Sequence, residues 1–219
     1  MNRKISSAPT RTPPDLEQNR EALAPVDAKL LEVGQTIQDS RLFGIDISGQ
    51  GFSSLRFVTC LLERVSFANC TIGSCRFRDV RLEKCDLSNA ALRGSEATRI
   101  ELVDCRLTGL KAIECRWRDV LIENCDARYA QFTDGAVIVS EFKTSQFLDA
   151  DFRNTALNDS IFMQASLTRA DLSGAKLRNV DLRGADISEA TLRVNDVNGA
   201  IVSPAQAMEL SRLLGVQIR

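Results

Sequence analysis

The sequence contains no histidine, and only one tryptophan and one tyrosine among its 219 residues. Without histidine, the Ser-His and Cys-His pairs that activate a nucleophile are absent. The phosphate-binding patterns G-x-x-x-x-G-K-(S/T) and G-x-G-x-x-G are absent as well. Since no residue pattern indicates a catalytic group, a cofactor or a metal-ligand set, we expect a protein that is not an enzyme.

The chain also lacks a strong net charge and long apolar runs. Its 28 basic and 29 acidic residues give a net charge of -1, which does not favour direct nucleic-acid binding or a polybasic membrane contact. No stretch approaches the roughly 18 apolar residues that cross a bilayer. Residues 1–11 contain no apolar signal-peptide core. We therefore expect a cytoplasmic protein that contacts neither a membrane nor nucleic acid directly.

What the chain does contain is a five-residue period. Every fifth residue from Ile37 to Val202 is apolar, without exception. Neither the 3.6-residue period of a helix nor the 2-residue period of a strand fits this spacing, so it predicts a repeat architecture. The clearest stretch is residues 170–189, which read ADLSG AKLRN VDLRG ADISE.

This pattern resembles the pentapeptide-repeat family, whose consensus is A-(D/N)-L-x-x. The resemblance implies an all-β solenoid, a right-handed quadrilateral β-helix with 20 residues per coil and about eight coils over residues 41–200. The small and the large residue would point inward, and the last two residues would turn the corner. Coils stacked about 4.8 Å apart would form a rod roughly 40 Å long. We expect an N-terminal tail and cap, partly disordered (1–36), the β-helix (37–202), and a C-terminal helix with a short strand (203–219).

The seven cysteines all lie in the small, inward register, two residues before a large apolar position. We interpret them as small buried residues with free thiols, as in a reducing compartment. With 20 residues per coil, Cys85, Cys105 and Cys125 should stack in one column. Such a column does not surround a metal ion tetrahedrally and fits a disulfide badly. The single tryptophan, Trp117, falls opposite Ala97 one coil earlier, which predicts a packed interior.

Both ends of the predicted β-helix need covering. We expect residues 1–14 to be disordered, and 15–23 and 26–33 to form short helices that cover the first coil. The leucines of this cover are Leu16, Leu23, Leu30 and Leu31. At the other end, Ser203 is an N-cap, Pro204 suits the first helical position and Gly215 suits the C-cap, so a helix is predicted through residue 214. Residues 216–219 alternate like a short strand.

The predicted C-terminal helix has an apolar face formed by Ala207, Leu210, Leu213 and Leu214. Two interpretations stay open: the face caps the last coil, or it forms a homodimer contact. The resemblance implies the second, because related family members dimerise through a C-terminal helix.

Sorting the charges by their place in a 20-residue coil predicts one acidic face and one basic face. The acidic face carries Asp46, Asp86, Asp126, Asp149, Asp186 and Glu189, with Arg106, Arg128 and Arg169 among them. The basic face carries Arg56, Arg76, Arg78, Arg99, Arg116, Arg118, Lys176 and Arg178. The alternative is that these charges are ordinary solvated surface pairs.

The family includes a class that protects DNA gyrase and related type II topoisomerases against poisons by imitating a DNA duplex. The resemblance therefore implies a topoisomerase partner, with the aspartates of the acidic face in place of phosphates. The sequence differs from that class in its near-zero net charge, in Arg106 on the acidic face and in its lack of projecting loops. The alternative is a structural or scaffolding module with another protein partner.

Overall fold

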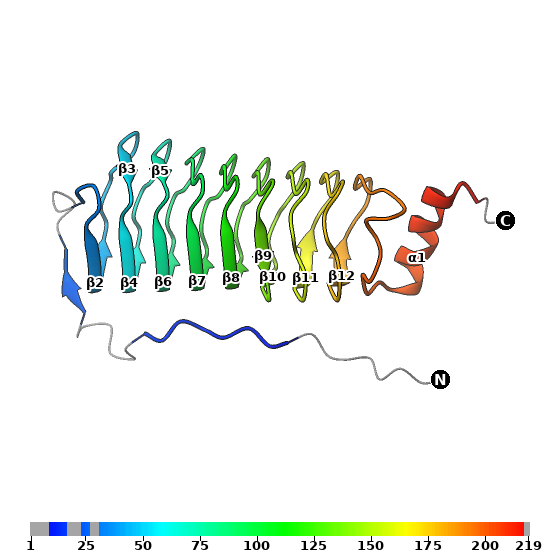
Figure 1. Cartoon of the computed structure of the whole chain (residues 1–219), viewed down its shortest axis with the longest axis horizontal. Coiled ribbons are helices and arrows are strands. Elements are labelled where there is room, and N and C mark those ends of the chain that lie inside the picture. The colour runs from blue at the N-terminus through cyan, green and yellow to red at the C-terminus, as the bar shows by residue number, and fades with distance from the viewer. Residues whose placement is uncertain (1–8, 17–22, 27–30, 217–219) are drawn as a thin grey trace.

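The computed structural model describes residues 9–16, 23–26 and 31–216. These residues form a rod of stacked coils, with the N-terminal stretch running beside it and a helix at the far end (Figure 1). The strands are β1 (Ala24–Pro25), β2 (Thr36–Phe43), β3 (Gly51–Ser53), β4 (Arg56–Glu63), β5 (Thr71–Gly73), β6 (Arg76–Glu83), β7 (Glu96–Val103), β8 (Arg116–Glu123), β9 (Ala136–Ile138), β10 (Glu141–Lys143), β11 (Ile161–Ser166) and β12 (Asp181–Asp186). The helices are α1 (Pro204–Leu210) and the 3-10 helix η3 (Ser211–Leu214).

Neighbouring strands run parallel, each one coil further along the chain. The main sheet has the order β1-β2-β4-β6-β7-β8-β10-β11-β12, with β9 also beside β8, and β3 pairs with β5. Phe57 pairs with Phe77, and Ala97 with Trp117, so the register advances by 20 residues per coil. The predicted fold class is confirmed: a parallel β-solenoid of about 8 coils with a single short C-terminal helix.

The corners of each coil recur every five residues because the backbone enters the left-handed region there. Thr59, Arg64, Asn69 and Ser74 have φ angles between 52° and 59°. Asn and Asp adopt this region more readily than most residues, and both types are frequent at the corners. This geometry explains why two mostly polar residues follow each large apolar residue in the sequence.

The inward side chains form one continuous core along the axis of the rod. The Phe142 ring stacks on the Phe162 ring with centroids 4.2 Å apart. Trp117 is 4% exposed and packs edge-on against Phe132, with ring centroids 5.8 Å apart. Trp117 also pairs with Ala97, so the predicted packing of a large residue opposite a small one is confirmed.

All seven cysteines are buried and free, as predicted. Six of their thiols, all but that of Cys75, also donate hydrogen bonds to carbonyl oxygens of the preceding coil: Cys85 Sγ donates to Leu62 O at 3.4 Å. Burial raises the pKa of Cys60 to about 11. The hydrogen bond with Cys125 and burial raise the pKa of Cys105 to about 12. The Cys60 and Cys105 thiols are therefore protonated at neutral pH and act as weak donors as well as small core groups.

The N-terminal stretch differs from the prediction. Residues 9–14, for which disorder was predicted, are extended and hydrogen-bonded to the rod, with Arg11 on Glu101 and the Thr12 N–H on Asp119. They are held because the outer surface of the rod offers them buried carboxylates. Residues 1–8, the rest of that prediction, lie outside the described residues.

The two predicted N-terminal helices are not present in the described part of the chain. Residues 15–16, 23–26 and 31–33 are not helical, and residues 17–22 and 27–30 lie outside the described residues. In place of a helix, β1 pairs with β2, where Ala24 opposes Ser40, so backbone hydrogen bonds cover this sheet edge. Leu23 and Leu31 are buried, as expected of residues that cover the first coil.

The start and the end of the C-terminal helix agree with the sequence prediction. The Ser203 hydroxyl accepts a hydrogen bond from Gln206 N, and the Gln206 side chain accepts one from Ser203 N. The Gln206 amide also donates to Leu182 O at 2.7 Å and Ala185 O at 2.8 Å. Gly215 ends the helix with φ of 70°. Gln206, which completes the N-terminal cap, therefore also attaches the helix to the last coils. The predicted strand at 216–219 lies outside the described residues except for Val216.

Candidate functional site

The structure places four of the predicted partner-binding residues in one column. Asp46, Ser66, Asp86, Arg106, Asp126, Gln146, Ser166 and Asp186 follow one another on successive coils through parallel bridges. Asp149 and Glu189 lie at left-handed corners three residues after this column, with φ of 55° and 58°. The acidic face is therefore a surface of the rod, although neutral residues and Arg106 separate its carboxylates.

Arginines neutralise three of these six carboxylates. Arg128 donates to Asp126 at 2.8 and 2.7 Å, and Arg169 donates to Asp149 at 2.8 and 2.7 Å. Asp86 lies 3.4 Å from Arg106. These hydrogen bonds hold the pKa of both Asp126 and Asp149 below the ordinary value, so the carboxylates are ionised but paired.

Carboxylates without an ion pair remain toward the two ends of the rod. Asp46 accepts hydrogen bonds from the Ser48 N–H at 2.9 Å and the Ser48 hydroxyl at 2.6 Å. Asp186 has the same arrangement with Ser188, at 3.0 and 2.6 Å. The side-chain and backbone hydrogen bonds lower the pKa of both aspartates. Within the described residues, no ion pair involves Asp46, Asp186 or the nearby Glu189.

The basic face is also largely paired within the rod. Arg76 lies 3.1 Å from Glu96, Arg99 lies 2.6 Å from Asp79, and Arg178 lies 3.6 Å from Asp159. Most of these pairs join residues on successive coils. The charged residues therefore lie on the faces predicted from the sequence. Ion pairs with neighbouring residues reduce the net charge that each face presents.

The C-terminal helix leaves part of the last coil uncovered. Leu210 and Leu213 pack against the core, whereas Leu214 is 65% exposed and Met208 is 57% exposed. Ala207 is exposed. Between helix and coil lies an apolar groove with a volume of about 250 Å³. Its lining residues are Val194, Val197, Ala200, Val202, Ala207, Leu210, Ser211, Leu213 and Leu214. The helix thus caps the core and also presents apolar side chains outward.

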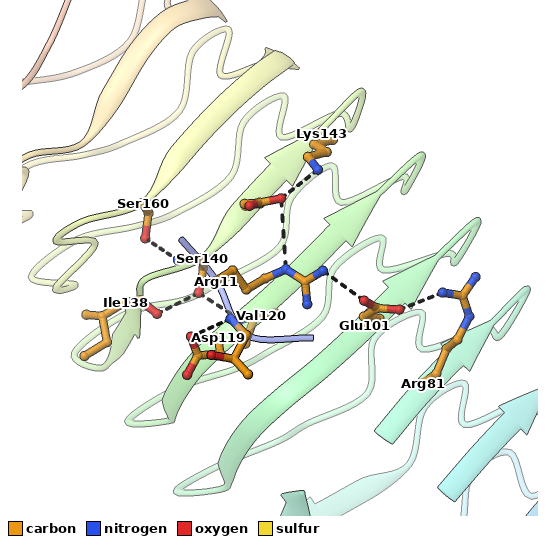
Figure 2. A network of polar contacts seen from close by, with 11 residues as sticks. Arg11, Arg81, Glu101, Asp119, Val120, Ile138, Ser140, Lys143 and Ser160 are labelled. Carbon is orange, nitrogen blue, oxygen red and sulfur yellow. Dashed lines mark hydrogen bonds and ion pairs between the residues drawn. The ribbon is translucent and has the colours of Figure 1, made fainter. Parts of the chain in front are cut away.

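A polar site that was not predicted from the sequence lies on the outer corner of the main sheet, where the N-terminal stretch binds. Figure 2 shows Arg11 beside Glu101, which also contacts Arg81. The Arg11 guanidinium lies 2.9 Å from Glu101 and 4.0 Å from Glu141. The sequence contains one sign of this site, because Leu121 occupies the outward register, which is normally polar. In the structure Leu121 is only 6% exposed.

Two backbone contacts continue this site toward the first coils. Thr12 N donates to Asp119 Oδ1 at 3.1 Å, and Asp15 N donates to Asp79 Oδ1 at 2.9 Å. Burial raises the pKa of Asp79, but hydrogen bonds from Arg99 and from the Asp15 N–H outweigh it and leave the pKa below its ordinary value. The Asp79 carboxylate therefore stays ionised beneath the N-terminal stretch.

No group of three or more metal-ligating side chains is found in the part of the chain that the structure describes. Within the same residues, none of the helices is long and apolar enough to cross a membrane. The described residues offer recognition through charges, backbone groups and an apolar groove.

Comparison with protein families agrees with this architecture. The family description "Pentapeptide repeat region" matches residues 75–149, and "Pentapeptide repeats (8 copies)" matches residues 145–184. The chain belongs to the pentapeptide-repeat family. No curated protein matches the sequence.

Solved structures that are similar to the chain have low sequence identities and TM-scores. One is QnrB1, a plasmid-mediated fluoroquinolone resistance protein, which is 23% identical with a TM-score of 0.39, covering 89% of this chain and 95% of that one. Another is HetL, involved in heterocyst differentiation regulation in the cyanobacterium Nostoc sp. strain PCC 7120. HetL is 17% identical with a TM-score of 0.32, covering 77% of this chain and 87% of that one. The function of this pentapeptide-repeat rod is therefore argued from its own surface residues.

Proposed function

We propose that this pentapeptide-repeat protein is a non-enzymatic protein-binding rod whose partner is a type II topoisomerase such as DNA gyrase, and that binding gives resistance or self-immunity to topoisomerase poisons. The observation that supports a binding role is the 20-residue register of the coils, which shifts locally where β11 pairs with β12 but accommodates no long inserted loop between residues 41 and 200. A partner must therefore contact the faces or the ends of the rod. The choice of partner rests on the family resemblance read from the sequence.

The pairing of charges changes how such a rod would engage the enzyme. Duplex DNA carries one phosphate charge about every 1.7 Å of its axis. On this rod Asp86, Asp126 and Asp149 are paired with arginines. The contact would therefore rely on the carboxylates without an ion pair, Asp46 near one end and Asp186 and Glu189 near the other, rather than on a continuous imitation of phosphates.

The apolar groove at α1 fits a second copy of the chain, and this is the dimer part of the proposal. Leu214 and Met208 are exposed beside the groove, while Leu210 and Leu213 pack on the last coil. In a homodimer these side chains would be buried against their equivalents. Light scattering of the wild type should give the mass of a dimer, and Leu214→Glu should give a monomer. A monomeric wild type would contradict this part.

The topoisomerase proposal is tested by direct binding of purified gyrase to the immobilised protein. We expect the double variant Asp186→Lys/Glu189→Lys to weaken binding at least about 10-fold, because it reverses unneutralised charge at the contact. Asp104→Lys is the matched control, since Asp104 is an exposed corner carboxylate on another face. Equal loss in both variants, or no binding by the wild type, would contradict the proposed contact.

A second candidate function is a scaffold for a different protein partner. The arginine pairing of Asp126 and Asp149 favours it, because these carboxylates are less available to an enzyme that binds DNA. A scaffold predicts that the wild type has no effect on topoisomerases and that an affinity capture recovers another protein. That capture should lose the partner when the relevant face carries charge reversals.

A further inference from the structure

The N-terminal stretch occupies a defined site on the corner of the rod. Its polar contacts come from one side chain, Arg11, and two backbone N–H groups, those of Thr12 and Asp15. The acceptors are four carboxylates contributed by strands of the main sheet and their corners: Glu101, Glu141, Asp119 and Asp79. The hydrogen bonds join residues 64 to 107 positions apart in the chain, so the site is made by the solenoid and not by local sequence.

The site also buries apolar surface outside the core. Leu121 is 6% exposed and Val139 is 6% exposed, yet neither belongs to the core that runs along the axis. Leu121 pairs with Glu101 on one side and Glu141 on the other. Because the Arg11 guanidinium contacts both glutamates, its side chain spans the position of Leu121. Arg11 is only 10% exposed, which fits an aliphatic stem packed on an apolar surface with its charge between two carboxylates.

The rod keeps this site in order without the N-terminal stretch. Glu101 also accepts a hydrogen bond from Arg81 at 2.6 Å, and Glu141 lies 2.6 Å from Lys143. Asp79 receives two hydrogen bonds from Arg99. Since these carboxylates have partners on the rod itself, departure of the stretch does not leave them as isolated buried charges. Occupation of the site is therefore compatible with exchange.

The N-terminal stretch satisfies the site incompletely. Among the described residues, Arg11 Nε and Nη1 are buried without a hydrogen-bond partner. Buried donors without acceptors weaken an interaction. A peptide whose arginine reaches Glu141 as closely as Glu101 would bind better than residues 9–16 do.

The contacts define the ligand that the site recognises. Between the two donating amides lie Pro13 and Pro14, which have no N–H and favour an extended backbone. The site therefore recognises one arginine side chain on an extended chain, together with the backbone N–H groups of the residues one and four positions after that arginine. No other side chain of residues 9–16 has a hydrogen bond or ion pair to the described part of the rod.

We infer that this corner of the rod is a binding site for an extended, arginine-bearing peptide segment of a partner protein, and that residues 9–16 occupy it as a tethered ligand. The tether gives residues 9–16 an effective concentration on the order of millimolar, so a free peptide of equal intrinsic affinity is disfavoured. A partner binds by displacing them. This inference is independent of the topoisomerase proposal.

The test uses the full-length protein and a fluorescein-labelled peptide with the sequence of residues 8–16, followed by fluorescence anisotropy. Arg11→Ala weakens the tethered ligand and leaves the site intact, so we expect it to bind the peptide at least about 10-fold more tightly than the wild type does. A peptide with alanine in place of its arginine should not bind. Adding Glu101→Gln to Arg11→Ala should weaken peptide binding at least about 10-fold. The matched control is Glu123→Gln in the same background, because no contact joins Glu123 to residues 9–16.

Equal peptide affinity of the wild type and Arg11→Ala, or equal binding of the two peptides, would overturn the inference. If the peptide binds too weakly to be detected, trypsin cleavage after Arg11 provides a second measurement. Trypsin cuts there only when the arginine side chain is accessible. Glu101→Gln/Glu141→Gln should be cut there at least about 10-fold faster than the wild type, and equal rates would overturn the site. If the peptide converts a dimer into monomers in light scattering, the occupant is the partner copy's stretch, which would overturn the tethered arrangement.

Discussion

The aromatic stack in the middle of the rod gives the clearest test of how the solenoid is stabilised. Phe142 is fully buried, its ring is stacked on Phe162 at 4.2 Å, and it meets Phe147 edge-on at 5.5 Å. Phe142→Ala removes these contacts and leaves a cavity that the coils above and below cannot fill without breaking their register. Phe→Ala substitutions in a core cost about 3–5 kcal/mol. For a protein of this size that loss corresponds to a fall of roughly 6–20 °C in Tm.

The assay is urea unfolding followed by the fluorescence of the single tryptophan, Trp117, which is buried in the same core. Phe43→Ala is the matched control, because Phe43 is 54% exposed, with the guanidinium carbons of Arg41 and Arg64 at 5.0 and 5.8 Å from its ring centre. We expect the control to cost about 1 kcal/mol or less. If Phe142→Ala cost no more than Phe43→Ala, the argument that the axial stack stabilises the rod would be refuted.

Three further predictions concern thiols, acid and close packing. At pH 8 the native protein should react with Ellman's reagent at least about 100-fold more slowly than the urea-unfolded chain, because thiols such as Cys105 are buried and protonated; fast native labelling would contradict this. The lowered pKa of Asp79 contributes stability that is present above the unfolded value of 3.8 and is lost as the pH falls through the lower folded value. Asp79→Asn should therefore reduce the fall in urea midpoint between pH 5 and pH 3, and an unchanged slope would count against the pairing. Gly135→Ala should cost about 1–3 kcal/mol, since its Cβ would lie 2.5 Å from a backbone oxygen of the preceding coil, whereas Gly51→Ala, with open space around it, should cost less in the same urea assay.

The coils were predictable from the sequence because the five-residue chemical period is also the geometric period of the corners. Ile37 to Val202 keep one register, and the backbone turns into the left-handed region at the same interval. The C-terminal helix was predictable because Ser203, Pro204 and Gly215 act locally, on their own helix ends.

The pairing of charges was only partly readable from the sequence. Once the coil is 20 residues long, Asp149 and Arg169 are expected neighbours, and they do pair. The pair of Asp126 and Arg128 within one repeat depends on a side-chain conformation that the period does not specify. The neutralisation of the acidic face therefore required the structure.

The N-terminal site was not predicted because no local pattern encodes it. Residues 9–16 are rich in proline and polar residues, a composition typical of disorder. Their order comes from Glu101, Glu141 and other carboxylates far along the chain. An outward-facing leucine such as Leu121 in a polar register was the one sign that something covers this corner.

A gyrase supercoiling and DNA-cleavage assay, with and without a topoisomerase poison, decides whether the rod acts on a type II topoisomerase as proposed. We expect equimolar or lower amounts of the protein to restore supercoiling in the presence of the poison and to reduce trapped cleavage complexes. Folded protein that leaves both activities unchanged across several poisons would contradict the claim and favour a scaffold for another partner.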